Sequence, residues 1–297
     1  MIDTVRLEWS GVDLGEGFEE WRQANHPTAR ITTSAFSANQ PWVGTMFNDP
    51  LLGTIGTKQN NKGNYLWVER SLPKHLYREN CRQLTLEEAR AALSQLMGDV
   101  EAYVVDFLPK SPRSAVQVKR VDFYHQRPMP AAEVFAHISG CLKKQKGVTT
   151  HLMGVEVHQS RELHGRFYDK GVESGNEQYI GVVRHEEQVR GAVAKQLLDV
   201  QSCAVDPAAV RSLMNKRFVG WPAEVECYGF EQLLRDQGYT GAAAASLLLM
   251  PQLEPVFRQV VSKTYFHKCK NLAVEAQRKM CRVDLRVPEG AWVEPGV

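Results

Sequence analysis

The sequence predicts an α+β fold, in which an antiparallel-rich sheet with helices packed to one side is followed by a mainly helical region. Within the first two hundred residues, polar and apolar residues alternate over short segments, which is typical of half-buried strands. Beyond residue 200 the apolar residues follow helical spacing instead. We therefore divide the chain into regions 1–200 and 201–297. Its 43% hydrophobic content is enough to bury a substantial core.

The expected strands are short and are separated by residues that favour turns. Residues 1–10 alternate as an opening strand, and the stretch that follows, to residue 62, is rich in Asn, Gly, Thr and Pro and predicts turns and short strands. The further strands expected from the alternation are 64–70, 115–124, 149–158, 163–170 and 179–189. Because Gly171, Gly175 and Asn176 separate the last two strands, we expect these two to pair as a hairpin.

Capping signals mark the first helices. Ser71-Leu-Pro-Lys74 predicts a helix start, with a serine cap and a proline in the first turn. A longer helix should run from Thr85 to about Leu108, because Thr85-Leu-Glu-Glu88 is a capping box. The other expected helices are 130–144, 207–217, 223–237, 242–250 and 254–280, before a short terminal strand at 282–287.

Bulk charge does not by itself predict a nucleic-acid partner, since the formal net charge is only +2. Cations do cluster locally between residues 256 and 286, where Lys268 and Lys270 lie among aromatic residues that would suit base stacking. A DNA-binding face and a merely solvated helix face both fit this segment.

Cysteine spacing and hydropathy indicate the compartment. The six cysteines include no Cys-x-x-Cys pair, so neither a zinc ribbon nor a disulfide scaffold is predicted, and a reducing cytosol fits. The N-terminus has no basic leader followed by an apolar run. The longest apolar run, 242–250, is too short to span a bilayer. We therefore expect no membrane partner.

The most distinctive segment is Arg166-Phe-Tyr-Asp-Lys-Gly-Val-Glu173. On a strand it would place Arg166, Tyr168 and Lys170 on one face. Neighbouring positive charge favours the phenolate and attracts a phosphate, so the pattern suits a tyrosine that attacks a phosphodiester. A half-buried sheet tyrosine without chemistry is the competing interpretation.

Two other segments each carry an arginine and a carboxylate two residues apart, which places each pair on one face of a strand. They are Arg120 with Asp122, and Arg184 with Glu186. Together with the tyrosine segment, they could assemble a metal-dependent nicking site, with the metal on the two carboxylates. Ordinary cross-strand salt bridges would give the same pattern. Glu173 would either complete the metal shell or cap its turn.

A resemblance to a known family is carried by six segments in chain order, which are 1–6, 66–74, 120–122, 167–173, 183–186 and 230–239. They resemble segments of the gene II replication initiators of filamentous bacteriophages. The resemblance implies a magnesium-dependent nickase and ligase. In that family, the protein nicks one strand of the double-stranded replicative form at the origin, leaves a 3′-hydroxyl that primes rolling-circle synthesis, and rejoins the displaced single strand.

Carried over by position, the resemblance places the family's nucleophile on Tyr168 and its lysine on Lys170. The metal ligands fall on Asp122 and Glu186, with Glu173 as a further candidate. No His-hydrophobic-His triplet of the kind used by many rolling-circle nickases is present, so carboxylates and a hard cation, Mg²⁺ or Mn²⁺, are expected. The expected DNA contacts are Arg120, Arg166, Arg184, Lys74, Lys268 and Lys270.

The resemblance also implies where the protein works and with what. Region 1–200 would be the catalytic nickase region and 201–297 a basic, DNA-contacting region. The partners would be origin DNA and the host helicase and polymerase, in the host bacterial cytoplasm.

Two other functions fit the same residues. One is a non-catalytic, sequence-specific origin- or operator-binding protein, and the other is a metal-dependent nuclease whose nucleophile is water. Tyr124 is a conceivable second nucleophile because it shares a face with Arg120 and Asp122, and Tyr179 ranks below it.

Overall fold

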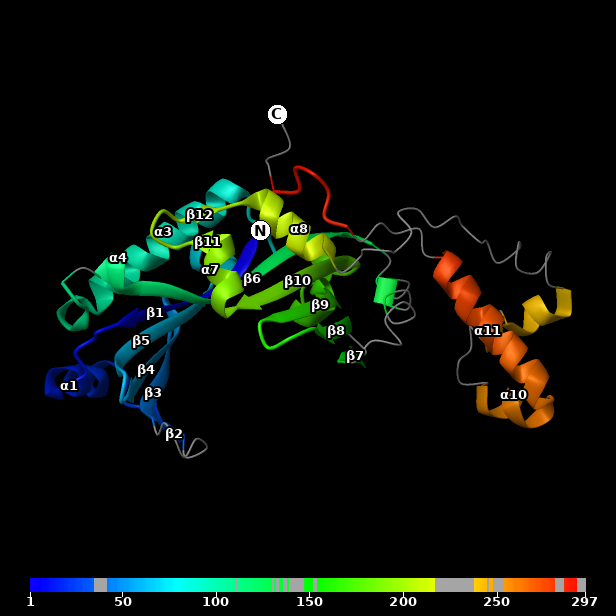
Figure 1. The fold of residues 1–297 in the computed structure, drawn as a ribbon, viewed down its shortest axis with the longest axis horizontal. Helices are drawn as coiled ribbons and strands as arrows, with labels where there is room; N and C mark the ends of the chain where they lie inside the picture. Colours follow the sequence, from blue (N-terminus) through cyan, green and yellow to red (C-terminus); the bar gives the residue numbers. More distant parts are fainter. Residues whose placement is uncertain are drawn as a thin grey trace.

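The computed structural model describes most of the chain and contains one large antiparallel sheet (Figure 1). The residues it describes are 1–34, 42–110, 112–129, 131, 134–135, 138, 147–151, 154–216, 238–244, 246–247, 254–280 and 286–292. Within these residues, ten strands pair in the order β2-β3-β4-β5-β1-β6-β10-β9-β8-β7. The α+β fold class predicted from the sequence is confirmed.

The strands of this sheet come in groups along the chain, with helices between the groups. The strands are β1 (Ile2–Ser10), β2 (Arg30–Ser34), β3 (Trp42–Asp49), β4 (Gly53–Asn60), β5 (Gly63–Ser71), β6 (Val116–Pro128), β7 (Val148–His151), β8 (Gly154–His158), β9 (Leu163–Asp169) and β10 (Val182–Arg190). The helices are α1 (Glu16–Asn25), α2 (Leu72–Tyr77), α3 (Leu86–Tyr103), η1 (Val105–Phe107), α4 (Pro112–Ala115), α6 (Lys170–Ser174), η2 (Glu177–Tyr179), α7 (Gly191–Leu197), α8 (Pro207–Lys216), α10 (Glu254–Val260) and α11 (Lys263–Met280). A small separate ladder pairs β11 (Leu198–Asp199) with β12 (Ala204–Val205).

One face of the sheet is apolar and carries the core. Side chains such as Val5 and Leu7 on β1 and Val121 on β6 are buried together with Leu93 and Leu96 of α3. A second buried cluster lies beneath β8, β9 and β10, where Val155, Phe167 and Val183 pack with Val134 and Ile138. Burial of one face fixes the pairing register, because a slip by one residue would move every apolar side chain into solvent.

The opposite face is polar. In the observed register, Thr4 on β1 lies opposite Asp122 on β6, and Glu186 on β10 lies opposite Arg166 on β9. Directly opposed residues and residues two apart on a strand share a face, so charged side chains from several strands meet here. All the predicted site residues of region 1–200 that lie on strands are on this face.

Most predicted strands are present, with three differences. The segment up to residue 62 contains α1, which the sequence did not predict, in addition to β2, β3 and β4. Segment 149–158 is two strands, β7 and β8, rather than one. β9 and β10 pair as expected, but α6 and η2 lie between them.

The predicted capping signals are confirmed. The side chain of Ser71 accepts a hydrogen bond from the backbone N–H of Lys74 at the start of α2. Thr85 and Glu88 form the capping box of α3, which ends at Tyr103 rather than near Leu108. The helix expected over 254–280 is divided into α10 and α11. The predicted helix 223–237 and most of helix 130–144 and strand 282–287 lie outside the described residues.

Residues on both sides of position 200 share the main core. Val205, Val210 and Met214 are buried in it, as are Val287 and Trp292 near the end of the chain. Among the described residues, no helix has the length and apolar character needed to cross a membrane.

Candidate active site

Tyr168 lies on the polar face of the sheet, on β9, between β10 and β8. Its hydroxyl donates a 2.8 Å hydrogen bond to Oε2 of Glu186 on the neighbouring strand β10. The other carboxylate oxygen of Glu186 accepts from the guanidinium of Arg166, and the Glu186 side chain is 0% exposed. Three residues from the predicted site are thus in direct contact.

A cavity of about 350 Å³ opens beside this pair. Four carboxylate side chains line it, from Asp3, Glu156, Glu173 and Glu186, against the single cation Arg166. Tyr168 is also in the lining. A phosphate entering this cavity would meet more negative than positive charge. The lining therefore attracts a cation more strongly than it attracts a phosphate.

The environment of Tyr168 keeps its phenol protonated. Burial raises the pKa of Tyr168 well above its ordinary value of 10.0, and the negative charge of Glu186 raises it further. The sequence-based expectation was that Arg166 and Lys170 would favour the phenolate. That expectation is wrong for the chain alone, because burial and the adjacent Glu186 carboxylate outweigh the positive charge of Arg184, which lowers the pKa of Tyr168.

Asp122 on β6 is the second buried carboxylate. It is 1% exposed and accepts a 2.8 Å hydrogen bond from Nε of Arg120. Burial raises the pKa of Asp122 to about 7, and the charge of Glu186 contributes in the same direction. Asp122 and Glu186 therefore each have an arginine partner but still repel one another.

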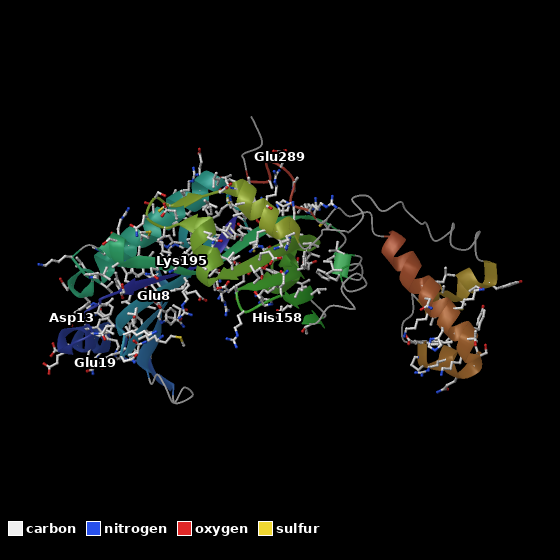
Figure 2. The ribbon with its side chains drawn as sticks, in the orientation of Figure 1. Glu8, Asp13, Glu19, His158, Lys195 and Glu289 are labelled. Carbon is white, nitrogen blue, oxygen red and sulfur yellow. The ribbon has the colours of Figure 1, made fainter. Side chains whose placement is uncertain are left out.

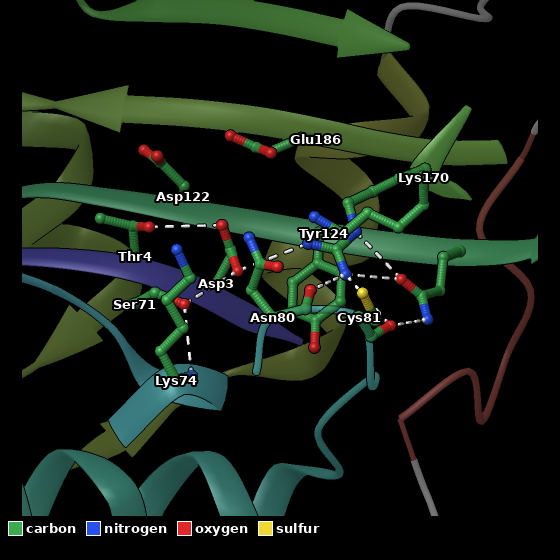
Figure 3. A network of polar contacts seen from close by, with 12 residues as sticks. Asp3, Thr4, Ser71, Lys74, Asn80, Cys81, Asp122, Tyr124, Lys170 and Glu186 are labelled. Atoms are coloured by element: carbon green, nitrogen blue, oxygen red, sulfur yellow. Dashed lines mark hydrogen bonds and ion pairs between the residues drawn. The ribbon is translucent and has the colours of Figure 1, made fainter. Parts of the chain in front are cut away.

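Asp3 brings a third carboxylate to this region. It accepts hydrogen bonds from the hydroxyls of Thr4 and Ser71 (Figure 3). Its pKa is raised, chiefly by burial and partly by Glu186. Sequence reasoning missed Asp3, because nothing in a lone aspartate on the opening strand distinguishes it from a surface residue.

Lys170 does not lie on the strand as predicted. It begins α6, because the side chain of Asp169 accepts a hydrogen bond from the N–H of Val172 and caps the helix. Lys170 is nevertheless close to the tyrosine, with Nζ 5.8 Å from the centre of the Tyr168 ring. It is fully buried, and its ammonium donates to Oε2 of Glu173 at 2.6 Å.

The prediction that Arg184 contacts DNA is wrong, since its side chain is 0% exposed. Its guanidinium donates to Oε1 of Gln126 at 2.7 Å and to the carbonyl of Asn80 at 2.6 Å, and it pairs with Asp3 at 3.4 Å. Arg184 thus anchors the 80–81 loop to the sheet.

Tyr124 is also buried in the core. Its hydroxyl donates to the carbonyl of Arg82 and accepts from the N–H of Leu84, both at 2.8 Å. Burial raises the pKa of this phenol, and its oxygen does not line the cavity that Tyr168 lines. The geometry gives Tyr124 a structural role.

The remaining predicted DNA contacts lie at different places. Arg120 bridges Asp122 and Glu69 on the polar face, and Lys74 is exposed on α2. Lys268 is exposed on α11, whereas Lys270 pairs with Glu254 of α10. The aromatic residues expected near them pack on one another, with the Phe257 and Tyr265 rings 6.4 Å apart.

The structure also assembles a cluster that sequence reasoning missed. Glu156 and His158 on β8 lie with His164 on β9, and their potential ligand atoms are within 4.8 Å of one another. Figure 2 shows His158 at the end of the sheet that carries β7 to β9. The sequence offers a weak signal, since Glu156 and His158 alternate on one strand face.

Comparison with known proteins finds a weak structural likeness. No protein-family model matches the chain, and no curated protein matches it. Among solved structures, the chain is similar to the rolling circle replication initiator protein from Geobacillus stearothermophilus. The match covers 79% of this chain and 83% of that chain, with 14% sequence identity and a TM-score of 0.33. A likeness at this level carries no argument about function, so the function has to be argued from the site.

Proposed function

We propose that this chain is a rolling-circle replication initiator that nicks one strand of origin DNA through Tyr168 and later rejoins the displaced strand. The observation that carries the proposal is the 2.8 Å hydrogen bond from the Tyr168 hydroxyl to the buried carboxylate of Glu186, at the wall of a cavity on the polar face. A nucleophile in contact with a base, which a third group orients, is the arrangement that covalent catalysis requires. Here Arg166 is the orienting group.

In the proposed reaction, the Tyr168 oxygen attacks the scissile phosphorus in line. The phenol proton passes to Glu186, to which the hydroxyl already points. The bond from phosphorus to the 3′-oxygen breaks, and that oxygen leaves as a 3′-hydroxyl by taking a proton from solvent, to which Glu186 later returns the phenol proton. The product is a 5′-phosphotyrosine, which conserves the energy of the phosphodiester, so a later 3′-hydroxyl can attack it and reseal the strand without ATP.

Glu186 fits the role of proton acceptor because it is charged at rest. Burial acts against its charged form, but Arg166, the hydrogen bond from Tyr168 and the charge of Arg184 together outweigh burial, and the pKa of Glu186 is lowered. Its basicity is therefore modest while Arg166 is in place. Contact of Arg166 with a phosphate would weaken that pairing and make Glu186 a better base for the phenol proton.

The carboxylates of this region offer the oxygen atoms that a hard divalent cation prefers, although among the described residues only Glu156, His158 and His164 bring three potential ligand atoms within 4.8 Å of one another. Asp3, Asp122 and Glu186 offer only oxygen ligands. Burial is the chief cause of the raised pKa values of Asp3 and Asp122, and the negative charge of Glu186 adds a smaller contribution that a bound cation would relieve. Glu173, at the cavity wall, is a further candidate ligand. Bound Mg²⁺ or Mn²⁺ would neutralise the scissile phosphate and stabilise its transition state.

Positive side chains on the same face would position the DNA. Arg166 lies at the cavity, and Arg120 lies one strand further across the sheet from β10. Lys74, Lys268 and Lys270 remain candidates for more distant phosphate contacts. As for the partners, we propose origin DNA in its double-stranded replicative form and as displaced single strand, with host helicase and polymerase following in the host bacterial cytoplasm.

Trapping of the covalent intermediate tests this proposal. Purified protein would be incubated with a panel of labelled single-stranded origin oligonucleotides and Mg²⁺ or Mn²⁺, then run on a denaturing gel. We expect a protease-sensitive adduct with the wild type and with Tyr179→Phe, which removes a half-exposed hydroxyl outside the cavity. Tyr168→Phe should form none.

Other outcomes point to the alternative functions. Cleavage without an adduct would indicate water as the nucleophile. Binding without cleavage, unchanged in Tyr168→Phe, would indicate a non-catalytic origin- or operator-binding protein.

A further inference from the structure

We propose that Glu156, His158 and His164 form a second metal site, one for a first-row divalent transition metal such as Zn²⁺. The inference does not rest on the proposed nickase function. It rests on how β8 and β9 pair, since His158 lies directly opposite His164 and Glu156 is two residues before His158 on the same face.

The spacing of the three side chains matches a metal site. Oε2 of Glu156 is 3.5 Å from Nε2 of His164 and 3.8 Å from Nε2 of His158. At metal–ligand bonds of about 2.0–2.1 Å, two ligands of a tetrahedral zinc ion lie roughly 3.4 Å apart. Both distances are near this value, while 3.8 Å is too long for a hydrogen bond.

The cluster is poorly explained by hydrogen bonding alone. The two imidazoles stack with their centres 3.9 Å apart and an interplanar angle of 14°. Nε2 of His164 is buried and makes no hydrogen bond. A buried polar atom without a hydrogen bond is costly, and a metal ion would give His164 Nε2 a stronger partner than its 3.5 Å contact with Glu156.

The donor set distinguishes this site from the carboxylates around Asp122 and Glu186. Two imidazoles and one carboxylate suit zinc and its first-row neighbours, whereas an all-oxygen set suits Mg²⁺. Three protein ligands also leave a coordination position open. Since the His158 side chain is 54% exposed, that position has access to solvent.

The site adjoins the Tyr168 cavity, because Glu156 lines that cavity and lies directly opposite Arg166 in the β8–β9 register. Gly154 permits this close packing of β8 on β9. A Cβ at Gly154 would lie 2.1 Å from the carbonyl oxygen of Phe167 and 3.0 Å from Tyr168. A metal here would place positive charge at the rim of a cavity lined mainly by carboxylates.

Direct metal binding by the full chain, freed of any histidine tag, tests the inference. Co²⁺ is the probe, read by its visible absorption and by calorimetry, with Zn²⁺ as competitor. We expect one site at which Zn²⁺ displaces Co²⁺ and a large excess of Mg²⁺ does not. Loss of a ligand in His158→Ala should weaken binding by more than the roughly tenfold that loss of an outer partner costs.

Three further variants keep the result interpretable. His267→Ala removes an exposed histidine on α11 and should leave Co²⁺ binding unchanged. Tyr168→Phe should also bind Co²⁺ normally, which separates this site from the nicking chemistry. Glu156→Gln should weaken binding while circular dichroism reports an intact fold. Undiminished Co²⁺ binding in both folded His158→Ala and Glu156→Gln would overturn the inference, as would displacement of Co²⁺ by Mg²⁺.

Discussion

The hydroxyl of Tyr168 and the carboxylate of Glu186 lie 2.8 Å apart on adjacent antiparallel strands, with Arg166 on the other oxygen of Glu186. This arrangement orients the phenol but also raises its pKa, so the resting tyrosine is a weak nucleophile. In the reaction we propose, its activation would require a change of charge around Glu186, through a bound cation or through a phosphate that engages Arg166.

Glu186→Gln should separate orientation from proton transfer. The amide keeps an acceptor for the Tyr168 hydroxyl but cannot take its proton. We expect adduct formation to slow by at least about 10²-fold, the usual contribution of a general base. Single-turnover adduct yield against time measures this. Glu177→Gln, an exposed acid on η2, is the matched control and should react like the wild type. An unaltered rate in Glu186→Gln would contradict its role as base.

Arg184→Met should destabilise the fold. The variant leaves Asp3 without its ion-pair partner and removes the bonds to Gln126 and Asn80. Loss of one partner of a buried ion pair costs about 3–5 kcal/mol of unfolding free energy. Urea denaturation measures the loss, and the exposed Arg161→Met should show little change. A normal unfolding midpoint but weakened DNA binding would restore Arg184 as a DNA contact.

His125 should make stability depend on pH. Burial and, to a smaller extent, the charges of Arg127 and His185 lower its pKa from 6.5 to about 3. A lowered histidine pKa means that the unfolded chain binds the proton more readily, so this contribution to stability is full above 6.5 and declines as the pH falls toward 3. The slope approaches about 1.4 kcal/mol per pH unit.

Calorimetry over this pH range should show that His125→Leu loses stability less steeply than the wild type. The exposed His267→Leu serves as control and should follow the wild type. Parallel curves for wild type and His125→Leu would mean that His125 is protonated in the folded protein.

Gly56→Ala should disturb the polar face some distance from the cavity. A Cβ at Gly56 would lie 2.2 Å from the ring of Trp67, over which the guanidinium of Arg6 stacks at 3.8 Å. Overpacking of this kind costs about 1–3 kcal/mol. Urea denaturation and tryptophan fluorescence report the loss and the ring's displacement.

Gly98→Ala in α3 is the matched control, because nothing lies within 4 Å of its Cβ. There, alanine should stabilise the helix by about 0.5–1 kcal/mol. Equal changes in unfolding free energy for the two substitutions would show that the Trp67 ring moves aside without a cost in stability.

Local signals predicted much of the fold. The capping box at Thr85 and the serine cap at Ser71 are short-range features, and both helices begin where expected. Helix α1 was missed because its N-cap, Gly15, makes no side-chain capping bond and the flanking sequence favours turns. Lys170 was placed on a strand because alternation continues through it, although Asp169 was a visible helix cap.

The sequence predicted which strand face each site residue occupies, because the alternation of polar and apolar residues decides that. It did not predict burial or clustering of side chains, because these depend on segments far apart in the sequence. Tyr168 and Glu186 share a face in the observed register, as the alternation indicated. The burial of Arg184 depends on the 80–81 loop, a contact 104 residues away in sequence. The histidine cluster depends on the β8–β9 register, which no single segment encodes.

The strand pairing also decides which changes of chain length the protein can tolerate. Loss of one residue within β9 ahead of Tyr168 would turn its ring toward the apolar face and the ring of Phe167 toward the polar face. A loop change at 159–162, between β8 and β9, would leave the alternation of both strands intact. Insertions and deletions in this part of the chain should therefore be confined to its turns, even though substitutions on the strands can be mild.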